Sequence, residues 1–354
     1  MSERTSSAFA ASTPPSDERN RVEAEGGTPQ ASGLRRLMGT SAGRNLGLVL
    51  ALLVLCAVGA GTGGERFVSV DNMLTILRLA AVLGVISIGM TFVIIGGGID
   101  LSVGAIVALA SVWATTVATQ SLAMDYHWIV MVFTAMVVGA ACGAVNGIFI
   151  AYGGMAPFIM TLAMMAGARG LAEIISQRRT QIVDVQSFVD FINGTLLGLP
   201  VLVWIFAVVS AIGWVMLNRT TFGRRTIAVG GNITAARLAG IAVKRHTLLL
   251  YTLLGLACGI AAVMLAARTT TGSSTHGLFY ELDVIAAVVI GGTLLTGGRG
   301  TIVGTIFGVL ILTTLTNVFV LNNLNSSAQA IAKGAIIVAA VLLQQRVAAR
   351  SDSS

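Results

Sequence analysis

Residues 93–110 read VIIGGGIDLSVGAIVALA, an apolar stretch that holds a cluster of three glycines and one acidic residue. The apolar flanks are typical of membrane helices, and the cluster Gly96, Gly97 and Gly98 interrupts them. Such an interruption permits a turn or a broken helix, whose freed backbone groups must face protein or a water-filled pathway. The stretch therefore predicts a helical membrane protein with broken spans.

The composition of the whole chain also indicates a lipid environment. Of 354 residues, 55% are hydrophobic and only 10% are charged, and the mean hydropathy is +0.87. No water-soluble domain of this size has such an apolar excess. The net charge of +7 is gathered between apolar runs, so it indicates topology and not a nucleic-acid partner. Cys56, Cys142 and Cys258 lie inside apolar runs without the spacing of metal ligands, so no metal site is expected.

About ten apolar runs are long enough, or nearly long enough, to cross a bilayer core of about 30 Å. They cover residues 46–61, 80–97, 103–119, 128–152, 157–175, 201–217, 247–267, 284–295, 303–321 and 328–343. We therefore expect an all-α, polytopic membrane protein with its transmembrane domain at residues 46–345. Residues 1–45 predict a disordered cytoplasmic tail and residues 346–354 a short cytoplasmic tail.

Basic residues predict which ends of the spans face the cytoplasm, because short loops rich in Lys and Arg stay there. They cluster before the first span, in the loop 218–246, and at the C-terminus, so both termini are expected in the cytoplasm. Six spans before the loop and four after it satisfy this arrangement. Arg178 and Arg179, in a loop placed outside, do not follow the rule. The clusters are Arg35, Arg36 and Arg44; Arg219, Arg224, Arg225, Arg237, Lys244 and Arg245; and Arg346 and Arg350.

A second glycine-rich segment resembles the first. VIIGGG at residues 93–98 precedes VGAI at 103–106, and VVIGG at 288–292 precedes VGTI at 303–306. The likeness fits an internal structural repeat with broken helices, although small residues in apolar helices also resemble one another by chance. The candidate hinges are Gly96, Gly97, Gly98, Gly291, Gly292, Gly297, Gly298 and Gly300.

Charged residues near the apolar runs suggest two kinds of role. Asp100 follows the first glycine cluster, where it either caps the next helix with Ser102 or lines a solute route, and we favour the cap. Arg169 and Lys333 lie in or beside apolar runs, where an isolated charge is costly, so we expect structural pairs and not a proton relay.

The basic loop 218–246 predicts a docking segment. It contains GRRTIAVGGN at residues 223–232 and TAARLAGI at 234–241. We interpret it as a glycine turn, Asn232 as a helix N-cap, and a short amphipathic helix. This helix is too brief and too rich in alanine to bury much area on a membrane, so it suits the groove of a partner protein.

Together with this loop, several colinear segments resemble the ribose, arabinose and galactose type permeases of bacterial ABC sugar importers. They are GGIDLSVG at 97–104, Asn146-Gly147, PFIMTL at 157–162, YELDVIAAVVIGGT at 280–293, GGRGT at 297–301 and AKG at 332–334. The resemblance covers residues 46–345. The long N-terminal tail and the Thr- and Ser-rich stretch 268–277 depart from the family pattern, which bears on the substrate and not on the class.

The resemblance implies that the loop couples the permease to a cytoplasmic ATPase. It also implies a second permease copy or homologue, an external sugar-binding protein, and ATP and Mg²⁺ held by the ATPase, with no cofactor on this non-enzymatic chain. The absence of a Walker A pattern is consistent with that division. The implied coupling residues are Gly223, Arg224, Gly230, Gly231, Asn232, Ala235, Ala236, Arg237 and Gly240.

The function implied is import of a monosaccharide across the bacterial inner membrane. The candidate pathway residues are Asn146 and Thr161, together with Asp100, Ser102 and the hinge glycines. Further hydroxyl groups that could contact a polyol are those of Thr91 and Ser210. A permease for nucleosides or branched-chain amino acids remains an alternative. An ion-coupled transporter should carry acidic groups near mid-membrane, whereas Asp100 and Asp283 lie near predicted helix ends. A structural scaffold would need neither broken helices nor a docking segment. Both are predicted here, so the scaffold is the less favoured alternative.

Overall fold

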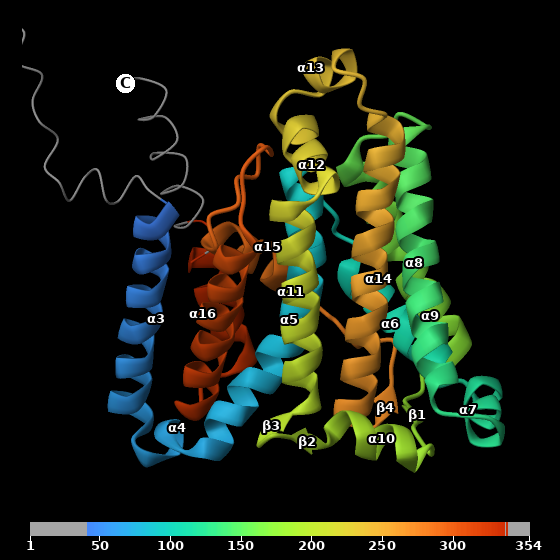
Figure 1. The fold of residues 1–354 in the computed structure, drawn as a ribbon. Helices are drawn as coiled ribbons and strands as arrows, with labels where there is room; N and C mark the ends of the chain where they lie inside the picture. The colour runs from blue at the N-terminus through green and yellow to red at the C-terminus, as the bar shows by residue number, and fades with distance from the viewer. Residues whose placement is uncertain (1–40, 337, 339–354) are drawn as a thin grey trace, which may run out of the picture. The chain divides into compact units, whose positions relative to one another are not determined.

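The computed structural model describes residues 41–336 and 338, which form a helical bundle with two small sheets (Figure 1). The helices are α3 (Ser41–Gly63), α4 (Glu65–Val68), α5 (Val70–Ile95), α6 (Val103–Ala114), α7 (Val117–Asp125), α8 (Ile129–Ala151), α9 (Pro157–Ser176), α10 (Gln186–Asn193), α11 (Val201–Arg219), α12 (Thr221–Gly231), α13 (Ile233–Leu238), α14 (Val243–Thr269), α15 (Tyr280–Ile290) and α16 (Ile302–Leu321). Strand β1 (Gln181–Ile182) pairs antiparallel with β4 (Thr271–Gly272), and β2 (Thr195–Leu196) with β3 (Leu199–Pro200).

Seven helices in the described residues are long and apolar enough to cross a membrane: α3, α5, α8, α9, α11, α14 and α16. Helices α6 and α7, bent by 56° at their break, make an eighth if they count as one span. Two of the predicted spans, 284–295 and 328–343, are not found among these long helices. Helix α15 has only 11 residues because turns at residues 274–279 precede it and a glycine cap ends it, and the predicted span 328–343 reaches beyond the described residues. The total of about ten therefore stays a prediction.

The predicted domain limits can be followed only in part. Helix α3 begins at Ser41, so residues 41–45, which the sequence analysis gave to the N-terminal tail, are helical. The rest of that tail and the C-terminal tail at 346–354 lie outside the described residues.

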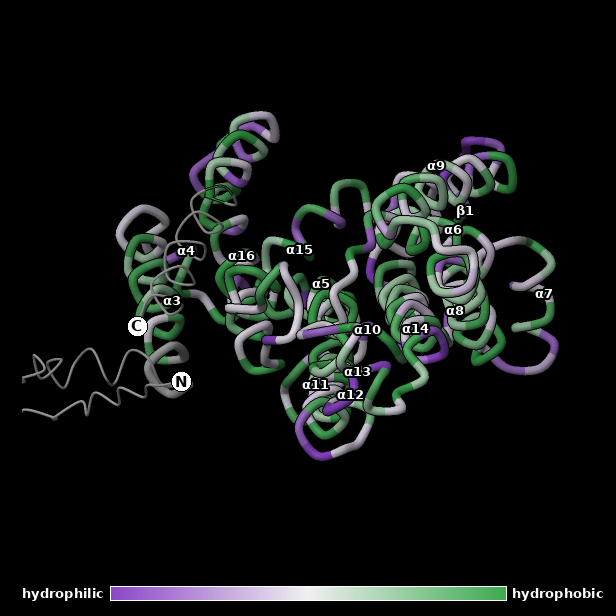
Figure 2. Tube along the Cα trace, turned by 90° about the horizontal axis from the view of Figure 1, so that it is seen from above, coloured by the Kyte–Doolittle hydropathy of each residue, from purple (hydrophilic) through white to green (hydrophobic). Residues whose placement is uncertain are grey.

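Helix α5 is the central element of the bundle. Its candidate span is 89% buried, and helices α11, α14, α15 and α16 contact it (Figure 2). A helix that is apolar all round can lie in a protein core or in lipid, and the contacts of α5 place it in the core. By contrast, the candidate span of α3 is only 6% buried, so its apolar side chains are free to contact lipid.

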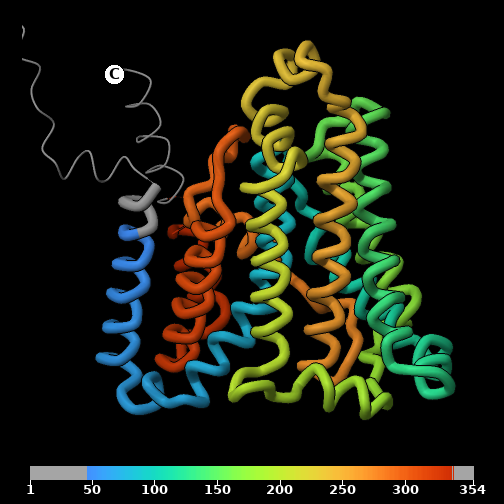
Figure 3. The backbone as a smooth tube through the Cα atoms, in the orientation of Figure 1, coloured from blue at the N-terminus to red at the C-terminus, as the bar shows by residue number. Residues whose placement is uncertain are grey.

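The bundle has two distinct ends, which can be followed along the backbone in Figure 3. Helices α12 and α13 lie at one end, beside the end of α11 and the start of α14. Helices α4 and α10 and the strands lie at the other end. We call them the α13 end and the α10 end. The six Lys and Arg residues of the loop 218–246 thus lie at the α13 end, whereas Arg178 and Arg179 follow α9 at the α10 end.

Glycines set the close approach of α8 and α14. A Cβ atom added at Gly143 would lie 2.2 Å from the carbonyl oxygen of Tyr251, and one added at Gly255 would lie 2.2 Å from the carbonyl oxygen of Gly139. The two backbones are therefore in direct contact, which only glycine permits at these positions. Close backbone approach is the usual source of packing energy between helices in lipid, where apolar side chains gain little by leaving the solvent.

We predict that Gly143→Ala destabilises the bundle, because the added methyl group overlaps a backbone atom that cannot turn aside. The expected cost is about 1–3 kcal/mol, the range for overpacked cores. Thermal unfolding of the purified protein in detergent measures it. Gly167→Ala is the matched control, since a Cβ atom at Gly167 meets nothing within 4 Å. Equal melting temperatures for the two variants would contradict the packing account.

Candidate functional site

Helix α5 ends with a defined backbone cap at the first glycine cluster. The amides of Gly97 and Gly98 donate to the carbonyl groups of Ile94 and Val93, each at 2.9 Å. Gly97 has a φ of 83°, in the left-handed region that glycine enters without steric cost. Together these two bonds form a Schellman motif, which satisfies carbonyl groups that the end of a helix leaves free.

Helix α15 ends with the same cap. The amides of Gly292 and Thr293 donate to the carbonyl groups of Val289 and Val288 at 2.8 and 3.2 Å, and Gly292 has a φ of 88°. After each cap the chain turns and begins another helix, α6 in the first case and α16 in the second. The two similar sequence segments therefore share their backbone hydrogen bonding, which supports the internal repeat.

Behind the first cap lies a buried polar cluster. One carboxylate oxygen of Asp100 accepts hydrogen bonds from the amide and the hydroxyl of Ser102, at 2.7 and 2.5 Å. The Nδ2 of Asn146 donates to the other carboxylate oxygen at 3.1 Å and to the Ser102 hydroxyl at 3.0 Å. All three residues are fully buried. Asp100 bonds only to Asn146 and to Ser102, the N-cap residue of α6, and to no amide of the helix itself. It therefore fixes the turn into α6, together with Asn146 from α8, and the capping interpretation is not supported.

Five glycines join this region to the docking segment, and we call Gly97, Gly230, Gly231, Gly297 and Gly298 the glycine junction. The Gly298 amide donates to the carbonyl oxygen of Ile95, the last residue of α5, at 2.8 Å. A Cβ atom at Gly230 would lie 1.7 Å from the same oxygen, and one at Gly297 would lie 3.0 Å from the Cα of Gly97. Candidate hinge residues and candidate coupling residues thus meet at one place.

The other predicted hinge residues lie close to the junction. Gly291 packs on the backbone of Gly304, where an added Cβ atom would lie 2.5 Å away, and Gly300 packs on the side chain of Ile95. Gly96 and Gly98 pack on Leu250 and Tyr251 of α14. Thr161 lies apart from them on α9, buried, with its hydroxyl bonded to the carbonyl oxygen of Pro157 at 2.9 Å.

The docking segment folds largely as expected. Asn232 is the N-cap of α13, and its side chain accepts a hydrogen bond from the amide of Ala235 at 2.9 Å, so this prediction is confirmed. Ala236 is buried against Val229 and Val243, whereas Arg224, Arg237 and Gly240 are exposed. Gly223 packs on the backbone of Leu217 at the turn from α11 to α12.

Two exposed apolar side chains on α13 escaped the sequence analysis. Leu238 is 85% exposed and Ile233 is 51% exposed, although both side chains are large and apolar. The sequence did contain a signal for this exposure, because the two are the only large apolar residues in a short helix of alanines and polar residues. Both side chains are therefore accessible to a partner at this end of the bundle.

Charged groups gather where α9 and α15 meet the connection 273–279, which consists of successive turns. Lys333 donates to the carboxylate of Asp283 at 3.0 Å, which confirms a structural pair for this cation. Arg169 donates instead to the backbone carbonyl groups of Ser274 and His276. Burial, Arg268 and Arg169 lower the pKa of His276, which lies outside the candidate spans, to about 4, so it is neutral at neutral pH.

The observed architecture defines a class before any comparison. Apolar helices surrounding a central span, two capped helix breaks at one end, and a protruding basic segment beside them describe a multi-pass α-helical membrane transport protein. Residues 72–341 match the family model described as branched-chain amino acid transport system / permease component. The chain belongs to this family of permeases, and it is accordingly a transport subunit and not an enzyme.

Similar proteins are named for sugar transport. The chain is 40% identical to the ribose import permease protein of Escherichia coli over 84% of this chain and 92% of that one. It is 41% identical to the ribose import permease protein of Bacillus subtilis, over 86% of this chain and 94% of that one. It is 37% identical to the L-arabinose ABC transporter permease protein of Azospirillum brasilense, over 84% and 87%. No solved structure matches the chain.

We predict that Gly230→Ala disrupts the glycine junction, because its methyl group would displace the end of α5 or the hinge after α15. Solute uptake by reconstituted protein should fall at least tenfold while the amount of protein inserted into the membrane stays the same. Gly231→Ala is the adjacent comparison, since a Cβ atom there meets nothing within 4 Å. If both variants transport equally, the junction does not connect the two sets of residues mechanically.

We predict that Asp100→Ala destabilises the protein more than Asp100→Asn does. Alanine leaves the buried amide and hydroxyl of Ser102 without their acceptor, at a cost of about 1–3 kcal/mol for each unsatisfied group. Asparagine keeps one oxygen, and the Asn146 amide can turn over to offer its Oδ1, which has no hydrogen-bond partner within the described chain. Melting temperatures in detergent test this order, and the reverse order would refute the role of Asp100 in fixing the turn into α6.

Proposed function

We propose that this chain is the permease subunit of an ATP-driven importer and carries a monosaccharide across the bacterial inner membrane. The observation that carries the proposal is its likeness, over most of its length, to proteins named as ribose and arabinose permeases. The family description names branched-chain amino acids, so import of such a solute is the second candidate. The individual relatives favour a sugar.

The α13 end should face the cytoplasm. Residues 191–280 contain no Asp or Glu, so the six cations between Arg219 and Arg245 are not balanced locally. Uncompensated Lys and Arg next to spans are held on the cytoplasmic side. The ten-span count and the cytoplasmic termini of the sequence analysis are consistent with this orientation.

An ATPase that binds ATP and Mg²⁺ would dock on α13. The exposed Ile233 and Leu238 of α13 suit an apolar groove on the ATPase, and Arg237 supplies a positive charge beside them. Movement of α13 would reach α12 directly and then the caps of α5 and α15, since Gly230 packs on the last carbonyl group of α5. Backbone contacts without intervening side chains transmit a displacement with little loss, because packed backbones resist compression.

A second copy of the permease, or a homologue, would pack against the side that carries α9 and α15. In Figure 2 this side lies opposite α11 and α12. It exposes Phe279 and Leu282 next to the half-buried Glu281 and Asp283. Ionisable groups among apolar ones at membrane depth are typical of solute pathways, so the route would run between the two copies. A sugar-binding protein would then dock at the α10 end.

We predict that deletion of Thr234–Gly240 abolishes sugar uptake and the coupled ATP hydrolysis but leaves membrane insertion intact. The deletion removes α13 without touching a candidate span. The wild-type chain, co-purified with the products of neighbouring genes and reconstituted in liposomes, provides the reference. ATP hydrolysis is measured across pentoses, hexoses, polyols and branched-chain amino acids.

Stimulation by one of the sugars would support the proposal and identify the cargo. Stimulation by an amino acid alone would replace it with the second candidate. Uptake by the chain without any partner under a proton gradient would refute both, and normal uptake by the deletion variant would refute the docking assignment.

A further inference from the structure

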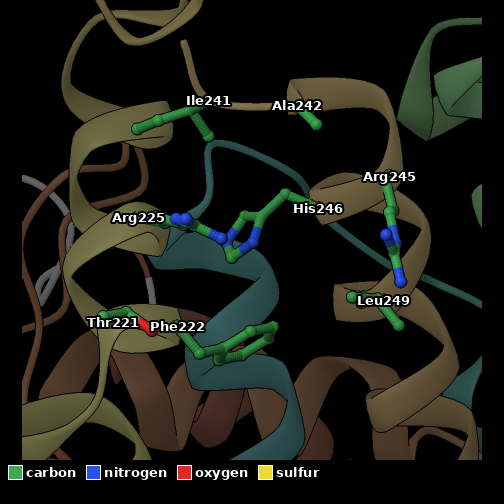
Figure 4. Close-up of a pocket in the computed structure, with 8 residues that line it drawn as sticks. All are labelled: Thr221, Phe222, Arg225, Ile241, Ala242, Arg245, His246 and Leu249. Carbon is green, nitrogen blue, oxygen red and sulfur yellow. The ribbon is translucent and has the colours of Figure 1, made fainter. Parts of the chain in front are cut away.

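A cavity of about 370 Å³ lies at the α13 end, on the side of the bundle away from α9 and α15. It opens between the first turns of α12 and the first turns of α14 (Figure 4). The glycine junction and the proposed pathway do not include any of its residues. Its lining consists of Thr221, Phe222, Arg225, Ile241, Ala242, Arg245, His246 and Leu249.

The cavity combines two guanidinium groups with an ordered polar wall. Figure 4 shows Arg225 pointing from α12 toward the His246 ring, with Arg245 on the other side of that ring. The Thr226 hydroxyl donates to the carbonyl oxygen of Phe222 at 2.9 Å and lies 2.9 Å from Nε2 of His246. Since the hydroxyl has one proton, Nε2–H must donate to it, and the imidazole is held in place.

Both guanidinium groups lack a carboxylate partner in the described part of the chain. The ion pairs there are Arg178 with Glu173 and Lys333 with Asp283, neither of which is near the cavity. The nearest acidic residues in sequence are Asp190 and Glu281, both outside the segment that builds this region. Two arginines that line one cavity without a counter-charge favour an anionic ligand from outside the chain, and phosphate suits their planar, forked donors.

One wall of the cavity is apolar. Leu249, in the second turn of α14, is 44% exposed, and the Phe222 ring packs on His246 with 4.7 Å between ring centroids. Cations over aromatic rings mark the level of the lipid headgroups on either side. Arg219 lies over Trp214 at 5.6 Å, and Lys244 lies over Tyr152 at 5.8 Å. An anion held here would have apolar surface directly below it.

We infer that this cavity binds the phosphate group of an anionic phospholipid, with Arg225 and Arg245 as the ligands and one acyl chain running over Leu249. A free phosphate ion would satisfy the arginines but would leave the apolar wall unused. A carboxylate of the ATPase is less suited, because α13 projects beyond α12, whereas the cavity is at the opposite, membrane end of α12. The inference rests on the proposed function only in placing this end in the cytoplasmic leaflet.

The test is a titration of the purified full-length permease in neutral detergent with 1-palmitoyl-2-oleoyl-phosphatidylglycerol, followed by native mass spectrometry. The variant Arg225→Gln/Arg245→Gln should bind this lipid at least tenfold more weakly, on the order expected for two cations at an anionic lipid surface. The matched control Arg219→Gln/Lys244→Gln removes the same charge at the same level outside the cavity and should keep most of the affinity. Arg225→Lys/Arg245→Lys, which keeps the charge but loses the fork, should lie between them.

Three outcomes would overturn the inference. Equal losses in the cavity pair and the control pair would indicate a general charge effect. Stabilisation by inorganic phosphate with no preference for phosphatidylglycerol over phosphatidylcholine would indicate a free-phosphate site. Loss of ATPase co-purification from the cavity pair, with unchanged lipid binding, would indicate a protein contact. None of these measurements depends on the cargo, so a failure here is distinguishable from a failure of the proposed transport function.

Discussion

The carbonyl oxygen of Ile95 is where the main parts of this protein come together. It ends the central helix α5, and in a lipid environment the last carbonyl groups of a helix must find donors inside the protein. The donor here is the amide of Gly298, from the connection that follows α15, and the backbone of Gly230 packs on the same oxygen. The end of α5, the connection after α15 and helix α12 therefore meet at a single contact, and any side chain at Gly230 would occupy its space.

The same requirement explains the contrast between the helices. Helix α5 is enclosed by other helices, whereas α3 exposes most of its apolar surface to lipid, and both sequences are equally hydrophobic. Hydrophobicity alone thus does not distinguish a core span from a peripheral one. Small residues set how closely two helices approach, because the faces of α8 and α14 that touch consist of glycine backbone.

The sequence predicted the membrane class, most span positions, the Asn232 cap and the two glycine segments, because these depend on local composition and on backbone preferences. It could not predict that Gly97, Gly230 and Gly298 meet, since they are separated by long stretches of chain and no periodicity links them. The predicted span 284–295 already had only twelve residues; α15 begins four residues earlier and ends at Ile290, because the glycine cap stops it there. The cavity beside Arg225 and Arg245 was equally invisible, because both residues were counted only as topology signals.

The glycine contact between α8 and α14 has a consequence for the order in which the protein is made. Helix α14 begins about ninety residues after α8 ends, which corresponds to roughly 5 to 20 s of synthesis at ordinary rates. During that interval the glycine face of α8 has no partner within the growing chain, and its backbone groups are shielded only by their own helix. Assembly of the core must therefore wait for α14 to enter the membrane, and the first half of the protein should persist meanwhile as a loosely associated set of helices.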